Sequence, residues 1–380
     1  MDRILPFTDE HEVFRSAFSE FLDQEVVPHY GQWEKNGSVP REIFKRFGEL
    51  GYLCIWLDEK YGGVGGDLLY SVIQAEEMNA RGLNSQYTRL HGDVIAPYIY
   101  AHGSEELKER WLPTCAAGEK ILAVAMSEPQ AGSDLASLET SAVKEGSYYI
   151  LNGNKAWISN GMLADLVVVA VRTDPNVKPH KGVSLLLVET NTPGFRRNRV
   201  QKIGMHAQDT AELFFSDCKV PQGNLLGEEN KGFYYLMEKL QWERIMAAIC
   251  AVNQAQYSLA LTIPYVKERK MFNQTLSAFQ NTQFELAKAA TEIEVAKSFV
   301  DQLVVQHLAG KKISKEVAMA KYYCCDLAFR TADRCVQLFG GYGLCEEYPI
   351  ARQFVDSRFS KMLGGTSEVQ LVIIAKELGL

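Results

Sequence analysis

The spacing of apolar residues changes twice along the chain, and this change constrains the fold more than any other feature. Over 8–122 apolar residues recur three and four positions apart, as in 13–22, which predicts helices. Over 121–227 short apolar runs alternate with Gly, Asn, Asp and Pro turns, which predicts strands. From residue 231 onward helical spacing returns. We therefore expect three domains, at 1–122, 123–228 and 229–380.

Turn residues divide these units further. Asn152-Gly153 lies between apolar runs and is the strongest hairpin motif, because a type I′ turn needs positive φ at both central residues. The strand spacing in this unit suggests a small antiparallel barrel or sandwich. In the last unit we expect the helices to break at Pro264, Gly310 and 340–343.

The composition excludes several classes of protein. Of the 380 residues, 47% are hydrophobic and 23% are charged, which is typical of a globular protein and excludes disorder and fibrous repeats. A net charge of −7 without a basic block argues against nucleic acid as a partner. The longest apolar runs, at 166–171 and 182–188, are too short to cross a membrane, so no membrane partner is expected.

The termini and the cysteines bear on location. The N-terminal segment is acidic and lacks the apolar stretch of a signal peptide. The eight cysteines form no CxxC pair and are too sparse for a disulfide scaffold. We therefore expect reduced thiols and a cytoplasmic location, and we predict no metal site.

Residues 123–134, AVAMSEPQAGSD, open the β unit. Ser127 ends an apolar run, and Ala131-Gly132-Ser133 offers small side chains, backbone N–H groups and a hydroxyl that a phosphate or a flavin edge could approach. A strand followed by a proline-containing turn explains the same pattern.

Residues 154–161, NKAWISNG, place an indole and a hydroxyl at strand spacing. Trp157 and Ser159 are two positions apart, so both could face the same planar ring. A tryptophan packed in the core is the alternative.

A glutamate interrupts an apolar stripe on the first helix of the last unit. The apolar members of this stripe are Leu236, Leu240, Ala247 and Cys250. Glu243 falls among them. An apolar wall would raise the pKa of this carboxyl, as a general base requires. A solvated glutamate, or one paired with Arg244, is the alternative.

Residues 364–368, GGTSE, begin the last helix. Ser367 and Gln370 have the spacing of a capping box. Free N–H groups and the positive end of the helix dipole would then point into the glycine turn. A simple interhelical turn explains the glycines as well.

Taken together, these segments resemble the acyl-CoA dehydrogenase flavoproteins. The resemblance rests on five motifs: SEPQAGSD (127–134), NGNKAWISNG (152–161), ERKMF (268–272), QLFGGYG (337–343) and GGTSE (364–368). It implies an α+β fold with an N-terminal α-helical domain, a central antiparallel β-barrel domain and a C-terminal four-helix bundle. It also implies FAD bound between the β domain and the bundle.

The resemblance assigns cofactor contacts residue by residue. Those to the isoalloxazine and pyrophosphate are implied for Val124, Met126, Ser127, Gly132, Ser133, Trp157, Ile158 and Ser159. The last helix completes the site with Thr366 and Glu368. Contacts to the FAD of a neighbouring subunit are implied for Arg269, Phe272, Gln280, Gln337, Gly340 and Gly341. A homotetramer, built as a dimer of dimers, is therefore expected.

The same resemblance indicates the catalytic base. Many family members carry a glutamate two residues before the threonine of the last motif, where this chain has Gly364. A branch that includes long-chain and isovaleryl-CoA dehydrogenases has Gly or Ala there and carries its glutamate on the first bundle helix. Glu243 matches that second position, so the apolar stripe and the Gly364 replacement both indicate Glu243 as the base.

The implied reaction is α,β-dehydrogenation of an acyl-CoA thioester. The α-proton goes to Glu243 and the β-hydride to flavin N5. A ribityl hydroxyl and the backbone N–H of Gly364 would stabilise the developing enolate, and exclusion of water would raise the pKa of the base. Arg244 and Ser133 match positions that contact CoA. Electrons would pass to an electron-transferring flavoprotein.

The resemblance implies that the helix 84–97 lines the acyl pocket, and this helix is unusually polar. Arg89, His91 and Asp93 could recognise an acyl chain that carries a carboxylate, or one of them could act as a second base on a cyclic substrate. The arrangement we expect instead has Arg89 and Asp93 in solvent and His91 alone in the pocket. Tyr87 shares the helix face of His91, and we predict that both contact substrate in a pocket narrowed by an aromatic ring.

Three functions are compatible with the sequence. The first is a dehydrogenase of an aliphatic, branched, dicarboxylic or cyclic acyl-CoA. The second is a flavin oxidase or monooxygenase on the same fold, against which the retention of Glu243 and Arg244 argues. The third is a non-catalytic member, for which Gly364 would be the main evidence.

Overall fold

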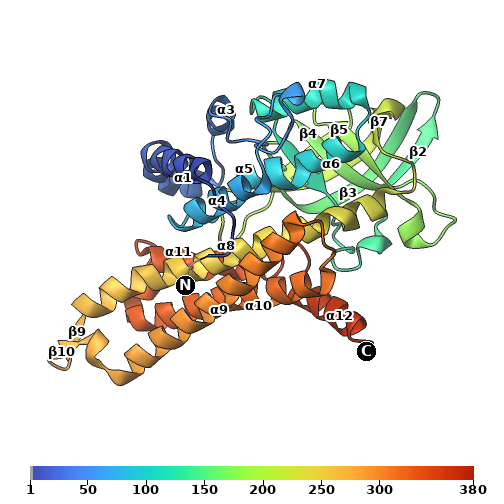
Figure 1. The fold of residues 1–380 in the computed structure, drawn as a ribbon. Helices are drawn as coiled ribbons and strands as arrows, with labels where there is room; N and C mark the ends of the chain where they lie inside the picture. The colour runs from blue at the N-terminus through green and yellow to red at the C-terminus, as the bar shows by residue number, and fades with distance from the viewer. Residues whose placement is uncertain (1–2) are drawn as a thin grey trace.

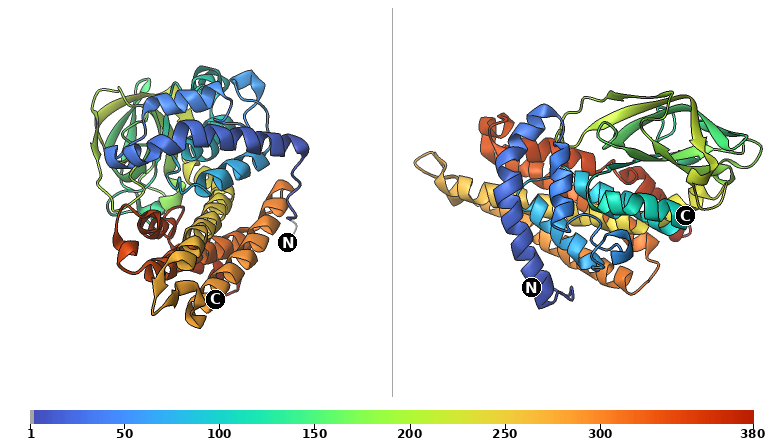
Figure 2. Two further views of the ribbon diagram at one scale, coloured as in Figure 1. Left: turned by 90° about the vertical axis from the view of Figure 1, so that its left-hand side faces the viewer. Right: turned by 90° about the horizontal axis from the view of Figure 1, so that it is seen from above.

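The computed structural model describes residues 3–380 as three packed units. The N-terminal helices and a curved sheet lie side by side, and both rest on a layer of long C-terminal helices (Figure 1). Views from the side and from above show the same arrangement (Figure 2). None of the helices within 3–380 is both long enough and apolar enough to cross a lipid bilayer.

The N-terminal unit is helical, as the spacing of its apolar residues predicts. Its helices are α1 (Asp9–Phe21), α2 (Val27–Asn36), α3 (Arg41–Glu49), α4 (Leu68–Asn79), α5 (Tyr87–Arg89), α6 (Ala96–His102) and α7 (Glu105–Ala116). A π-helical segment, Leu90–Ile95, joins α5 to α6. A π turn holds more residues than an α turn, so it changes which side chains share a face.

The helix predicted over 84–97 begins three residues later, at Tyr87. Side chains from other elements bind the polar groups of the residues before it. Tyr30 accepts a hydrogen bond from the N–H of Ser85, and Asp356 accepts one from the side chain of Asn84. These partners satisfy the segment in a non-helical form, which helix formation would disrupt.

The β unit is an eight-stranded sheet with the order β6-β7-β3-β2-β4-β5-β8, in which β1 pairs with β4. Its strands are β1 (Leu122–Ala125), β2 (Ser141–Glu145), β3 (Tyr148–Ser159), β4 (Leu166–Arg172), β5 (Val183–Glu189), β6 (Phe195–Arg199), β7 (Thr210–Pro221) and β8 (Leu225–Leu226). The pairs β1·β4 and β2·β4 are parallel, and the other pairs are antiparallel as expected.

The hairpin predicted at Asn152-Gly153 is wrong. The turn between β2 and β3 lies at Gly146-Ser147, and β3 continues through the Asn-Gly pair. The pairing of β3 with β7 shifts register between Leu151 and Gly153, which marks a bulge. Gly153 has φ +139°, and a Cβ there would lie 2.7 Å from the Cα of Thr140. A glycine is therefore needed at this position both for the bulge and because the backbone of Thr140 lies too close for a side chain.

The C-terminal unit consists of long packed helices and one small hairpin. Its elements are α8 (Gly232–Glu268), β9 (Lys270–Met271), β10 (Gln274–Thr275), α9 (Gln280–Leu308), α10 (Ser314–Phe339), α11 (Pro349–Ser360) and α12 (Ser367–Glu377). The breaks predicted at Gly310 and 340–343 are confirmed. The break predicted at Pro264 is wrong, because α8 continues through it for another turn, where a proline removes only one backbone bond.

Helix α8 connects the three units. One apolar core joins α4, α8, α9 and α10 and includes Val72 and Ile249. Another joins α6 and α7 to β1, β4 and β5 and includes Leu112, Val168 and, from α8, Leu236. The part of α8 between Leu236 and Ile249 therefore lies at the junction of all three units.

Candidate functional site

Glu243 lies in this junction with one carboxylate oxygen enclosed. Its Oε2 is buried and accepts no hydrogen bond from residues 3–380. Burial raises the pKa of Glu243 above its usual value, although the positive charges of Arg244, Arg89 and Lys321 oppose the shift. This excludes a solvated glutamate, and it is the environment that the apolar stripe predicts.

The glycine turn before α12 meets this carboxylate. A Cβ placed on Gly364, where φ is +63°, would lie 3.4 Å from Oε1 of Glu243. The Glu243 carboxylate thus reaches the point from which a side chain at 364 would extend. Arg244 Nε donates to the carbonyl of Gly364 at 3.2 Å, and Lys321 Nζ donates to that of Gly365 at 2.7 Å. The N–H of Gly364 has no acceptor in the described part of the chain, so the turn offers a free donor beside the carboxylate.

Helix α12 is capped one residue earlier than the sequence predicted, at Thr366 instead of Ser367. Thr366 is the N-cap, and its hydroxyl accepts from the N–H of Val369 at 3.3 Å. The capping box predicted from Ser367 and Gln370 is wrong, because Gln370 turns back to the carbonyl of Gly365. The hydroxyl of Ser367 is buried without a partner among residues 3–380, and Glu368 is exposed.

Two residues beside Glu243 were not predicted from the sequence. Tyr98, on α6, is buried with an unpartnered hydroxyl in the described structure, and burial followed by the charge of Glu243 raises its pKa. Lys321, on α10, holds the glycine turn through Gly365. Neither carries a sequence motif, because a single tyrosine or lysine on a helix is typical of an ordinary core or surface position.

The β domain presents an exposed indole toward solvent. Trp157 is 65% exposed and has φ +63°, at a register shift between Lys155 and Ile158. The alternative of a packed core tryptophan is therefore wrong. Ile158 is buried in the sheet core, so only its backbone can contact a cofactor. Ser159 is half-buried two residues further along the strand than Trp157.

The first strand and the following loop supply the other predicted cofactor residues of this domain. Val124 and Met126 are half-buried and alternate with buried alanines, so their side chains share one face. Ser127 is half-buried, whereas Gly132 and Ser133 are exposed. A Cβ on Gly132 would meet no atom of residues 3–380 within 4 Å, so the loop leaves open space there.

A buried ion pair ties this loop to the strand of Trp157. Lys155 Nζ donates to Glu128 Oε1 at 2.8 Å, and both side chains are almost completely buried. Glu128 also accepts from the backbone N–H groups of Glu139 and Thr140. Burial lowers the pKa of Lys155 to about 8, although Glu128 opposes the shift. This ion pair holds the loop against the strand. The sequence did not reveal it, because no local pattern connects two residues that are far apart in the chain.

These features fit a flavin. An exposed aromatic ring, a small-residue loop and the free N–H of Gly364 are compatible with a planar ring and a phosphate. The unpartnered hydroxyl of Ser367 adds a polar group at the start of α12. We therefore regard the surfaces of β1, β3 and the 364–368 turn as the places where one FAD would be held.

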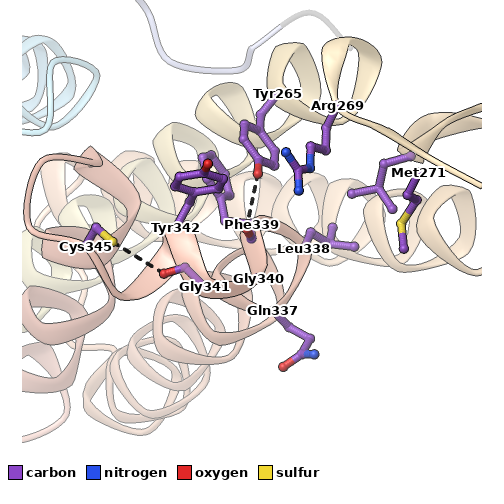
Figure 3. A pocket seen from close by; sticks show the side chains of 11 residues that line it. Tyr265, Arg269, Met271, Gln337, Leu338, Phe339, Gly340, Gly341, Tyr342 and Cys345 are labelled. Atoms are coloured by element: carbon purple, nitrogen blue, oxygen red, sulfur yellow. Dashed lines mark hydrogen bonds between the residues drawn. The ribbon is translucent and has the colours of Figure 1, made fainter.

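The remaining predicted cofactor residues form a separate group. Arg269, Gln337, Gly340 and Gly341 line a pocket of about 470 Å³ at the end of α10 (Figure 3). Phe272 lies on the neighbouring hairpin and is 82% exposed. Gln280 is exposed at the first turn of α9. This end of the bundle points away from the β domain (Figure 1), so a single chain does not bring the two groups together.

The structure contradicts the predicted exposure of the polar helix. Arg89 and Asp93 are 6% and 7% exposed, so the expectation that both face solvent is wrong. Asp93 accepts a hydrogen bond from Ser71 of α4 at 2.8 Å, and Arg89 donates to Cys250 of α8. The segment is packed between two helices, which the polar composition alone did not indicate.

The predicted substrate contacts of His91 and Tyr87 are not supported. His91 is fully buried, its Nε2 lies 3.0 Å from the carbonyl of Cys115, and its Nδ1 accepts from the N–H of Leu122. Burial lowers its pKa to about 4, so the ring is neutral. Both of its nitrogens are occupied by hydrogen bonds with the backbone. The fully buried ring of Tyr87 packs edge-on against Phe44 in the core of the N-terminal unit.

Comparison with known proteins agrees with this architecture. Three family profiles match in succession: "Acyl-CoA dehydrogenase, N-terminal domain" at 8–119, "middle domain" at 123–218 and "C-terminal domain" at 230–379. The mitochondrial long-chain specific acyl-CoA dehydrogenase of Sus scrofa is 44% identical over 98% of this chain and 87% of its own length.

Solved structures give the same result. The crystal structure of an acyl-CoA dehydrogenase from Geobacillus kaustophilus has a TM-score of 0.98 and 52% identity, with full coverage of both chains. A glutaryl-CoA dehydrogenase from Mycobacterium smegmatis in complex with FADH2 has a TM-score of 0.90 and 30% identity, covering 98% of this chain and 95% of that one.

Proposed function

Because the chain belongs to the acyl-CoA dehydrogenase family and is an FAD-dependent enzyme of that family, we propose that Glu243 removes the α-proton of its acyl-CoA thioester. The observation that carries this proposal is the Glu243 carboxylate, enclosed with a free Oε2 beside the free N–H of Gly364. When bound, FAD accepts the hydride from the β-carbon.

The turn at Gly364 complements the base. Its free N–H can donate to the thioester carbonyl oxygen, on which negative charge develops as the α-proton leaves. Arg244 and Lys321 hold the carbonyls of Gly364 and Gly365, which restrains the turn that carries this donor. We propose that Arg244 and the exposed Ser133 also contact the CoA moiety.

Other parts of the proposal rest on the same family pattern. The FAD contacts are those of β1, the 127–133 loop, β3 and the turn before α12. The pocket near Arg269 would receive part of the FAD of a second subunit, and its place at the far end of the bundle from the β domain supports an assembly of at least two chains (Figures 1 and 3). A homotetramer made of dimers is the assembly that the family pattern implies. An electron-transferring flavoprotein is the proposed acceptor. Eight free cysteine thiols support a cytoplasmic location.

An anaerobic titration of the FAD-loaded protein tests this function. Straight, branched, dicarboxylic and cyclic acyl-CoA thioesters are added in turn, and the loss of flavin absorbance is followed. Bleaching by at least one class is expected, with the 2,3-enoyl-CoA as product. Absence of bleaching with every class would contradict the dehydrogenase proposal. Rapid reoxidation by air, with formation of hydrogen peroxide, would instead indicate the oxidase alternative.

The pH dependence of the reaction should reflect the raised pKa of Glu243. A base must be ionised, so kcat/KM is expected to fall as the pH is lowered through this pKa, which lies above that of an ordinary glutamate. Asp93 is a second buried carboxyl, and burial raises its pKa to about 6. The acidic limb should therefore be retained in Asp93→Asn, and its loss in that variant would contradict the assignment to Glu243.

A further inference from the structure

Arg89 and Asp93 are two buried charged groups that lack full partners. The Nε–H of Arg89 is buried without an acceptor among residues 3–380, and its other two nitrogens donate to the sulfur of Cys250 and to Oε1 of Gln86. One oxygen of Asp93 binds Ser71, but Oδ2 is buried without a donor. Leaving such groups unpaired costs several kcal/mol each unless something else binds them.

The pair lies along the same wall as the catalytic carboxylate. Arg89 donates to the sulfur of Cys250, which follows Glu243 by two turns on α8, about 10 Å along the helix axis. The charge of Arg89 also acts on Glu243 and opposes the rise in its pKa. An acyl chain that starts beside Glu243 and follows α8 therefore leads toward Arg89 and Asp93.

The free atoms define the chemistry of the group that fits. Arg89 Nε–H is an open donor and Asp93 Oδ2 is an open acceptor, and the two residues lie one turn apart. A hydroxyl can accept from the first and donate to the second. An alkyl chain would leave both atoms unpaired, and a carboxylate could accept from Arg89 but has no proton to donate to Asp93 Oδ2.

We propose that the enzyme prefers acyl-CoA thioesters that carry a hydroxyl group on the distal part of the chain, bound between Arg89 and Asp93. This proposal rests on the proposed function, since the same site must accept the acyl chain. It assigns the far end of the acyl chain to Arg89 and Asp93, whereas the reaction at the α- and β-carbons is unchanged.

The wild-type enzyme gives the first test. Unsubstituted, ω-hydroxy and ω-carboxy acyl-CoA thioesters are compared over a series of chain lengths by anaerobic flavin reduction and by kcat/KM. At the best length the ω-hydroxy compound should exceed the unsubstituted one by about 10-fold or more. Equal or lower values at every length would overturn the proposal, while bleaching by the unsubstituted chains would leave the dehydrogenase function intact. A preference for the ω-carboxy compounds would overturn it in favour of a dicarboxylic substrate.

Variants test whether these two residues cause the preference. Arg89→Met and Asp93→Leu should each reduce the hydroxy-to-unsubstituted ratio of kcat/KM to near 1, mainly through KM. Arg196→Met, which replaces an exposed arginine of β6, should leave the ratio unchanged. If Arg89→Met folds poorly, Asp93→Asn offers a milder change that retains the partner of Ser71. A ratio that survives in Asp93→Asn and in every other folded variant of the pair would contradict the assignment.

Discussion

Glu243→Gln is expected to lower the rate of flavin reduction by acyl-CoA by about 10²- to 10⁴-fold. Glutamine has nearly the same shape as glutamate and fits the same enclosed position, but its amide cannot take up the α-proton. The flavin should remain bound, because the predicted FAD contacts lie on β1, β3 and the 364–368 turn. The measurement is single-turnover bleaching under anaerobic conditions, with the flavin spectrum recorded before substrate is added.

Glu238→Gln provides the matched control for this change. Glu238 lies on the same helix but is exposed and pairs with its neighbour Lys239. This control should react at the wild-type rate. If Glu243→Gln also reacted at that rate, Glu243 would not be the base. If neither the wild type nor the variants reduced flavin, the non-catalytic alternative would gain support.

The order of the three units could be predicted because it depends on local spacing. Apolar residues at helical intervals before 122 and after 231, and short apolar runs between them, are properties of neighbouring residues. The predictions were wrong where contacts with distant parts of the chain overrode a local motif. The Asn152-Gly153 pair is a hairpin motif in isolation, but Gly153 faces the backbone of Thr140 and forms a bulge in a longer strand.

The candidate site was predictable to the same extent. Glu243 was found because its stripe lies on one helix, where spacing fixes which side chains share a face. Arg89 and Asp93 were expected in solvent because both side chains are charged. The composition of their segment does not show that α4 and α8 cover it. The π turn at Leu90–Ile95 adds to this error, since it changes the helical phase that the prediction assumed.

Glu128→Gln is expected to destabilise the folded protein by about 3 to 5 kcal/mol. The change leaves Lys155 buried in the β domain without its carboxylate, and the loop at 127–134 loses its link to the strand of Trp157. Lys155→Met should cost less, because Glu128 would keep the N–H groups of Glu139 and Thr140. Urea unfolding of each variant, followed by intrinsic fluorescence and by release of flavin, measures these changes.

A double variant separates the ion pair from general disruption of the core. Glu128→Gln combined with Lys155→Met removes both charges, so its destabilisation should be smaller than the sum of the two single changes. Lys144→Met breaks the half-exposed pair that β2 makes with Glu229 and should change stability by no more than about 1 kcal/mol. Additive effects in the double variant would show that the two residues act independently. Coupling would establish that the 127–134 loop and the strand of Trp157 are held together by one buried ion pair.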